Sequence, residues 1–263
     1  MRLLIVGDVV GRAGRRALRA LLPDIVAREN IDFVVANCEN AASFTGITPR
    51  LVEQILSWGV DAITMGNHVW AQKSIYDTAH QESRFIRPAN YPPGVPGAGG
   101  RVLQARNGAM VATINLCGRI FMEPMECPFR AADAEIERLR EQADVIVVDF
   151  HAEATSEKAA LGRYLDGRVA VVAGTHTHVQ TADERILPGG TAYITDCGMT
   201  GPLESVIGIA PDLVIRRFLT RMPVRFEAAR GIAALCGIIV DADEATDSAR
   251  SIVRVCEVHE PRP

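Results

Sequence analysis

Short apolar runs alternate with stretches of helical periodicity along the first half of the chain. Residues 2–6 are apolar and end at Gly7-Asp8, which is typical of a buried strand. Leucines and branched residues then recur at helical spacing over 18–26, with charges between them. The same reasoning predicts further strands at 33–36, 61–65, 102–105, 110–116, 144–148 and 169–173, and helices over 49–56, 131–142 and 156–165.

The end of the chain has a different pattern. Pro188, Gly189 and Gly190 predict a hairpin turn, and the apolar runs 232–240 and 251–258 predict an antiparallel pair. Together these elements predict an α/β fold in which the N-terminal strands are parallel and the C-terminal strands are more often antiparallel. Since no linker composition appears, we expect residues 1–263 to form a single domain.

Composition narrows the class of protein. Hydrophobic residues make up 48% and charged residues 23%, so disordered and fibrous classes are excluded. The formal net charge of -4 gives no general attraction to nucleic acid or acidic membranes, so an anionic substrate requires a local feature, either a metal or an arginine cluster. The longest late apolar run, 232–240, is too short to span a membrane. Six scattered cysteines without a CxxC pair indicate reduced thiols, and we expect a cytoplasmic protein.

Five of the predicted strands are each followed by a cluster of polar residues that can bind metals. In α/β sheets, ligands bind beyond the carboxyl ends of the strands, so these clusters should converge on one crevice. Four of the six histidines belong to them. The clusters are Gly7-Asp8, Asn37-Cys38-Glu39-Asn40, Gly66-Asn67-His68, Asp149-Phe150-His151 and Gly174-Thr175-His176-Thr177-His178.

Carboxylate, amide and imidazole groups suit Fe, Mn, Zn or Co. On an extended segment His176 and His178 share one face and can each serve one ion of a close pair. Glu39 is a reasonable bridge between two ions. Two divalent cations held by Asp8, Glu39 and a bridging hydroxide would keep a net charge of about +1, which favours binding of a phosphodiester. The cations would also make the hydroxide available at neutral pH for attack on phosphorus. His68 is then the natural general acid.

Each cluster also has a purely structural interpretation. Asp8 could cap a helix, His151 could be a core histidine, and Asn67-His68 could be a plain turn. Asn40 follows Glu39 directly, and consecutive side chains diverge unless the loop turns. Arg12, Arg15 and Arg16 could hold phosphate near the first helix, although a solvated helix face is the commoner outcome.

The clusters, in this order, resemble the calcineurin-like metallophosphoesterases, and most closely their YmdB-type branch. The segments that carry the resemblance are GDVVGRAGR, ANCENAA, TMGNHVW, FHAE, GTHTHVQTADE and TAYITDCGMTGP, and together they cover nearly the whole chain. Two departures from the broad superfamily are Val10, where a histidine is usual, and Glu39, where the bridging aspartate is usual.

The resemblance implies a four-layer α/β/β/α sandwich of two mixed sheets around two divalent or mixed-valence ions, with iron or manganese favoured and zinc allowed. Asp8, Glu39, Asn40 and His178 would bind the first ion, Glu39, Asn67, His151 and His176 would bind the second, and His68 would be the acid. The expected substrates are small phosphodiesters such as 2′,3′-cyclic nucleotides.

Several alternatives stay open. The same ligands could serve a phosphomonoesterase, an amidohydrolase, or a non-catalytic regulator that binds metal or nucleotide. No strong nucleic-acid signal or membrane partner is expected, and a homo-oligomer is not excluded. The Pro-Gly-rich segment 88–100 and the apolar segment 121–129 could each cover the site.

Overall fold

Two mixed β-sheets, packed face to face, form the centre of the protein. The computed structural model describes residues 1–260. The first sheet has the order β2-β12-β13-β1-β3-β4-β5, and β14 also pairs with β13. Its strands are β1 (Arg2–Val6), β2 (Asp8–Val9), β3 (Phe33–Asn37), β4 (Ala62–Thr64), β5 (Phe85–Ile86), β12 (Met199–Pro202), β13 (Ala233–Asp243) and β14 (Ser248–His259).

The second sheet has the order β10-β11-β9-β8-β7-β6. In both sheets the central strands run parallel and the antiparallel pairs lie toward one side or at the edges. The strands of the second sheet are β6 (Gly100–Gln104), β7 (Met110–Cys117), β8 (Val145–His151), β9 (Val171–Thr175), β10 (Arg185–Ile186) and β11 (Ala192–Ile194).

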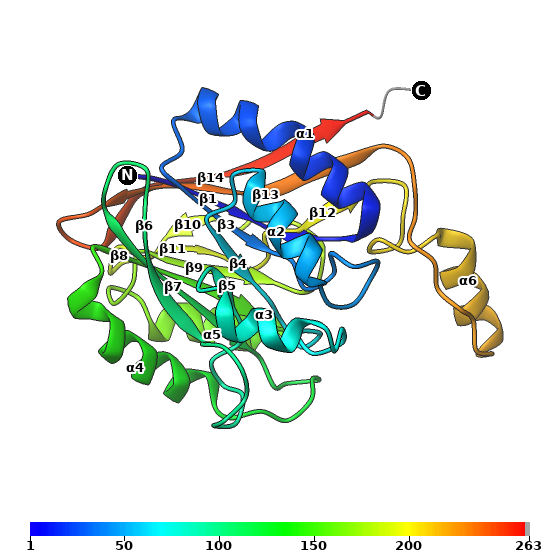
Figure 1. Cartoon of the computed structure of the whole chain (residues 1–263), viewed down its shortest axis with the longest axis horizontal. Helices are drawn as coiled ribbons and strands as arrows, with labels where there is room; N and C mark the ends of the chain where they lie inside the picture. Colours follow the sequence, from blue (N-terminus) through cyan, green and yellow to red (C-terminus); the bar gives the residue numbers. More distant parts are fainter. Residues whose placement is uncertain (261–263) are drawn as a thin grey trace.

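Helices cover the outer face of each sheet, α1 to α3 on the first and α4 and α5 on the second (Figure 1). The helices are α1 (Gly11–Glu29), α2 (Pro49–Ser57), α3 (Ile75–Gln81), α4 (Pro128–Leu139), α5 (Thr155–Tyr164) and α6 (Pro211–Thr220), with a 3-10 turn η1 (Arg140–Gln142) after α4. No helix of residues 1–260 is long and apolar enough to cross a membrane.

Three apolar cores separate the four layers. The alternation along β1 shows how one strand serves two of them, because successive side chains point to opposite faces. Leu4 and Val6 pack toward the helices, whereas Leu3 and Ile5 pack against the second sheet. A third core lies between the second sheet and its helices. The predicted α/β/β/α sandwich of two mixed sheets is therefore confirmed.

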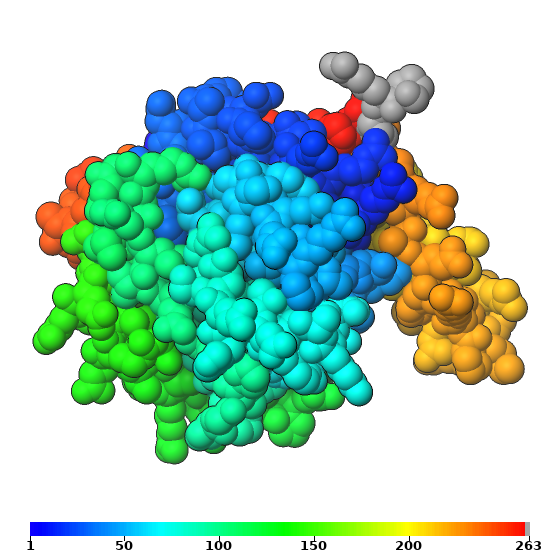
Figure 2. Space-filling view, in the orientation of Figure 1, coloured from blue at the N-terminus to red at the C-terminus, as the bar shows by residue number. Residues whose placement is uncertain are grey.

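Most predicted elements are present, with ends displaced by a few residues. The short elements β2, β5 and β12 were not predicted, and neither was α6. It projects from the body of the protein and returns through residues 221–231, and Figure 2 shows this part as a protrusion. Within α6 only Val214 is buried, while Phe218 and Leu219 are 69% and 80% exposed. Apolar residues recur at helical spacing over 213–219, so the sequence held the signal for this helix.

Candidate functional site

Two buried carboxylates follow neighbouring strands of the first sheet. Asp8 comes after β1 and Glu39 after β3, and these parallel strands bring both side chains to the same edge. They are 0% and 1% exposed. Asp8 Oδ2 accepts a hydrogen bond from the His176 backbone N–H at 3.0 Å, but Asp8 Oδ1 has no hydrogen-bond partner within residues 1–260. A buried carboxylate oxygen without a donor favours a cation beside it.

His151, at the end of β8 in the second sheet, points toward Glu39. Its Nε2 lies 3.1 Å from Glu39 Oε1, and its Nδ1 lies 2.9 Å from Thr175 Oγ1. That hydroxyl donates to Asp149 Oδ1 at 2.7 Å, and Asp149 also accepts from Asn37 and Thr64. This buried chain of hydrogen bonds fixes the imidazole ring with Nε2 facing the site.

The turn after β9 delivers two histidines to the site in a conformation that was predicted wrongly. His176 and His178 have φ angles of 98° and 65°, so the segment is a turn rather than an extended strand. Between them, Thr177 donates from its N–H and Oγ1 to Asp196 Oδ2, at 3.0 and 2.7 Å. These bonds redirect the backbone and hold two residues in the left-handed region, which few non-glycine residues adopt.

The turn gives the two imidazoles different neighbours. His176 Nδ1 lies 3.0 Å from His151 Nε2, and its Nε2 lies 3.1 Å from a carboxylate oxygen of Glu153. His178 donates from Nδ1 to the carbonyl oxygen of Ile207 at 3.0 Å, and its Nε2 lies 3.7 Å from Asp8 Oδ1. The lone pair of His178 Nε2 is therefore directed into the site.

Asn40 lies within the site, so the loop does turn after Glu39. Its Nδ2 is 3.2 Å from Glu39 Oε1 and 3.1 Å from His178 Nε2. Its Oδ1 is 3.3 Å from Nδ1 of His68, and that nitrogen is also 3.3 Å from Glu39 Oε1. The backbone N–H of His68 donates to Glu39 Oε2 at 3.0 Å.

The segment before His68 packs directly on the site. A Cβ at Gly66 would lie 2.3 Å from Glu39 Oε2 and 2.4 Å from His151 Nε2, so only glycine fits there. The Oδ1 of Asn67 is buried and has no hydrogen-bond partner in the described part of the chain. The structure thus brings Asp8, Glu39, Asn40, His68, His151, His176 and His178 together, with Asn67 between Gly66 and His68.

The carboxylates and imidazoles of the site shift one another's pKa values. Burial raises the pKa of Glu39, but the charges of His151 and His68 outweigh it and hold that pKa well below its usual range. The pKa of Asp8 is lowered in the same way, mainly by His178 and His151. Burial lowers the pKa of His151, yet Glu39 and Asp8 raise it to about 9. Two ionised carboxylates in a buried site therefore favour a positive charge between them.

His176 has the opposite shift. Burial and the charge of His151 lower its pKa to about 4, so its imidazole is neutral at pH 7 and can act as a ligand. One oxygen of Glu39 and one nitrogen each of His151 and His176 lie within 4.8 Å of one another, a spacing at which one ion could contact all three. The donor set, the unpartnered oxygens of Asp8 and Asn67, and this spacing fit metal ions.

Sequence reasoning assigned no role of their own to several residues around the site. Asp149 and Thr175 orient His151, Asp196 holds the histidine turn, and Glu153 contacts His176. The sequence held a signal for Asp149, because it is the one acidic residue in VIVVDFH, a strand that is otherwise apolar up to its final histidine. The contact of Glu153 could not be found from the sequence, since it depends on the φ angle of His176.

The two segments suspected of covering the site are joined to each other. The Asn90 side chain donates to the carbonyl oxygens of Cys117 and Glu126 and accepts from the Cys117 N–H. Gly118, which follows β7, donates to the carbonyl oxygen of His151. Gly118 thus connects this pair of segments to His151, while the side chain of Phe121 is 89% exposed.

Comparison with known proteins gives consistent matches over the whole chain. The model of the family described as YmdB-like protein matches residues 4–255. The chain is 48% identical over 255 residues to the 2′,3′-cyclic-nucleotide 2′-phosphodiesterase of Bacillus subtilis strain 168, a match that covers 97% of this chain and 96% of that protein.

Two solved structures have nearly the same fold. A hypothetical protein from Thermus thermophilus is 43% identical, with a TM-score of 0.91 and coverage of 99% of this chain and 100% of that one. A phosphatase from Mycoplasma pneumoniae is 34% identical, with a TM-score of 0.91 and coverage of 99% and 94%.

Proposed function

The chain belongs to the YmdB-like protein family, and we propose from this premise that it hydrolyses phosphoric esters, with small phosphodiesters such as 2′,3′-cyclic nucleotides as substrates. The name of the Bacillus subtilis relative supports this substrate class. The observation that carries the proposal is the buried cluster in which two ionised carboxylates face three imidazoles. Such a cluster is the environment that hydrolytic metal ions require.

The cluster would hold two cations, for which iron or manganese is proposed. The first would be bound by Asp8, Glu39, Asn40 and His178, and the second by Glu39, Asn67, His151 and His176. The unpartnered oxygens of Asp8 and Asn67 support these assignments, as does the fixed orientation of His151. Glu39 Oε1 contacts a group of each set, His151 Nε2 at 3.1 Å and Asn40 Nδ2 at 3.2 Å, and this supports the role of Glu39 as the bridge.

When bound, a pair of divalent cations would supply positive charge to the phosphate oxygens and lower the pKa of a water toward about 7, so that it attacks phosphorus at neutral pH. The residues of the chain prepare for this step. The Asp149-Thr175 hydrogen bonds keep His151 Nε2 directed inward, and Ile207 does the same for His178 Nε2. Burial of Asp8 and Glu39 excludes bulk water from the centre.

His68 is assigned the transfer of a proton to the leaving ribose oxygen. Its side chain is 36% exposed, so it lies where a substrate enters. Contacts of its Nδ1 with Glu39 and Asn40 fix the ring and leave Nε2 to face the substrate. A proton given to the leaving oxygen as the P–O bond breaks removes the charge that would otherwise develop there.

The direct test combines metal analysis with substrate comparison. Purified protein should contain close to two metal ions per chain and should hydrolyse bis-(p-nitrophenyl) phosphate and 2′,3′-cyclic AMP. Hydrolysis of p-nitrophenyl phosphate tests a second candidate function, that of a phosphomonoesterase. The similarity to the phosphatase from Mycoplasma pneumoniae favours this candidate. Metal-loaded protein that is inert on both diesters would refute the proposed function, whether or not it binds nucleotide.

A further inference from the structure

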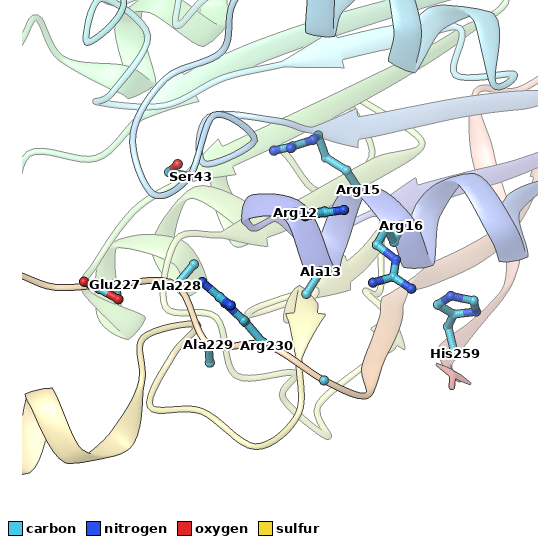
Figure 3. A pocket seen from close by; sticks show the side chains of 11 residues that line it. Arg12, Ala13, Arg15, Arg16, Ser43, Glu227, Ala228, Ala229, Arg230 and His259 are labelled. Atoms are coloured by element: carbon cyan, nitrogen blue, oxygen red, sulfur yellow. The ribbon is translucent and has the colours of Figure 1, made fainter. Parts of the chain in front are cut away.

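A pocket rich in arginine lies at the start of α1, outside the cluster of proposed ligands. Its volume is about 420 Å³, and its walls come from the first turns of α1, from Ser43 and from residues 227–231. Arg12, Arg15 and Arg16 contribute from the helix and Arg230 from the opposite wall (Figure 3). Glu227 is the one acidic residue of the lining, and Figure 3 shows it at the end remote from Arg16.

The charges of these arginines are not neutralised within residues 1–260. Arg12, Arg16 and Arg230 form no ion pair or side-chain hydrogen bond there, and the Arg15 guanidinium donates to the uncharged carbonyl oxygen of Ala41. Burial and the charge of Arg12 lower the pKa of Arg15. The first turn of α1 holds no acidic residue, so the positive end of the helix dipole adds to this field. A pocket with this field favours an anion.

Two segments connect the pocket with the proposed metal site. On one side the loop 40–43 contributes Asn40 to the site and Ser43 to the pocket, so their Cα atoms are no more than about 11 Å apart. On the other side the carbonyl oxygen of Ile207 accepts from His178, and the next residue, Gly208, accepts from the N–H of Ala229 in the pocket wall. One elongated ligand can therefore reach both.

The segment that carries Arg230 into the pocket, together with α6 before it, is rich in arginine. Residues 211–231 contain Arg216, Arg217, Arg221, Arg225 and Arg230, against Asp212 and Glu227 alone, in a chain of 28 basic and 32 acidic residues. The side chains of Phe218 and Phe226 are 69% and 38% exposed between these arginines. Arginines that contact a backbone together with exposed aromatic rings are the features by which proteins bind single-stranded nucleic acid.

We propose that the arginine pocket binds a backbone phosphate of an oligoribonucleotide whose 2′,3′-cyclic phosphate end lies at the metal site. This inference rests on the proposed function and names the substrate as the end of an RNA fragment rather than a free mononucleotide. The overall negative charge of the protein does not conflict with it, because residues 211–231 hold five arginines against two acidic residues.

The test compares 2′,3′-cyclic AMP with a hexaadenylate that ends in a 2′,3′-cyclic phosphate. For the unmodified protein, kcat/KM should be at least about tenfold higher on the hexaadenylate, the effect of one or two charged hydrogen bonds. In the double variant Arg16→Ala, Arg230→Ala, this preference should fall about tenfold, because KM for the hexaadenylate rises. The salt dependence of log KM should weaken by about 0.7 for each phosphate that the variant no longer binds.

Arg19→Ala is the matched control, because Arg19 is an exposed arginine of α1 outside the pocket, and it should leave the preference unchanged. An unchanged preference in the double variant, or an equal loss on both substrates, would overturn the inference. So would inorganic phosphate that alters turnover of 2′,3′-cyclic AMP only when Arg16 and Arg230 are present, since the pocket would then bind a free anion. If the unmodified protein hydrolyses neither substrate, the proposed function itself fails.

Discussion

Replacement of Lys158 by methionine should strongly destabilise the protein, because it would leave a buried charge without its partner. Lys158 Nζ donates to Asp196 Oδ2 at 2.7 Å, and the two side chains are 1% and 0% exposed. Asp196 keeps its bonds to Thr177 and Gly198 in the variant but loses the cation that is paired with it. Breaking a buried pair in this way costs about 3–5 kcal/mol of the free energy of unfolding.

Urea unfolding of the metal-free protein measures this cost. It is obtained from the shift in the urea concentration at the unfolding midpoint, provided that the dependence of the free energy of unfolding on urea keeps the same slope. The control is Arg168→Met, which breaks an ion pair with Asp133 of the same 2.7 Å length but 38% and 41% exposed. There the loss should stay below about 1 kcal/mol. Addition of Asp196→Asn to Lys158→Met should recover part of the stability, because no buried charge then remains at this position. Equal costs for Lys158→Met and Arg168→Met would refute the reasoning.

Three further predictions concern the proposed site. His68→Ala should keep its metal but lose about 10²–10⁴-fold in kcat, as for a lost general acid; loss of metal in elemental analysis would make His68 a ligand instead. Gly66→Ala should lower the affinity for metal about 10–100-fold, because the added Cβ would collide with Glu39 and His151. Competition with a chelator dye measures this affinity, and an unchanged value would contradict the packing described. Chelation should abolish hydrolysis and lower the thermal midpoint, and manganese or iron should restore both; activity that survives chelation would exclude the metal mechanism.

The sequence was sufficient to locate the candidate site because the site is built at strand ends. Asp8, Glu39 and His151 each follow an apolar run, and the parallel pairing of β1 with β3 and of β7, β8 and β9 brings such residues to common edges. The continuous apolar character of each run likewise predicted which strands are buried on both faces.

Features that depend on tertiary packing could not be predicted in this way. The positive φ angles of His176 and His178 depend on hydrogen bonds to Asp8 and Asp196, which are distant in sequence or follow another strand. The arginine pocket required knowledge of where residues 227–231 return.

The division of the cluster between the two sheets has a consequence for assembly. Asp8 and Glu39 follow strands of one sheet, and His151 and His176 follow strands of the other. Neither half could chelate an ion tightly before the sandwich closes, so bound cations would cross-link the halves and slow their separation. Metal supply would then govern the lifetime of the protein as well as its turnover.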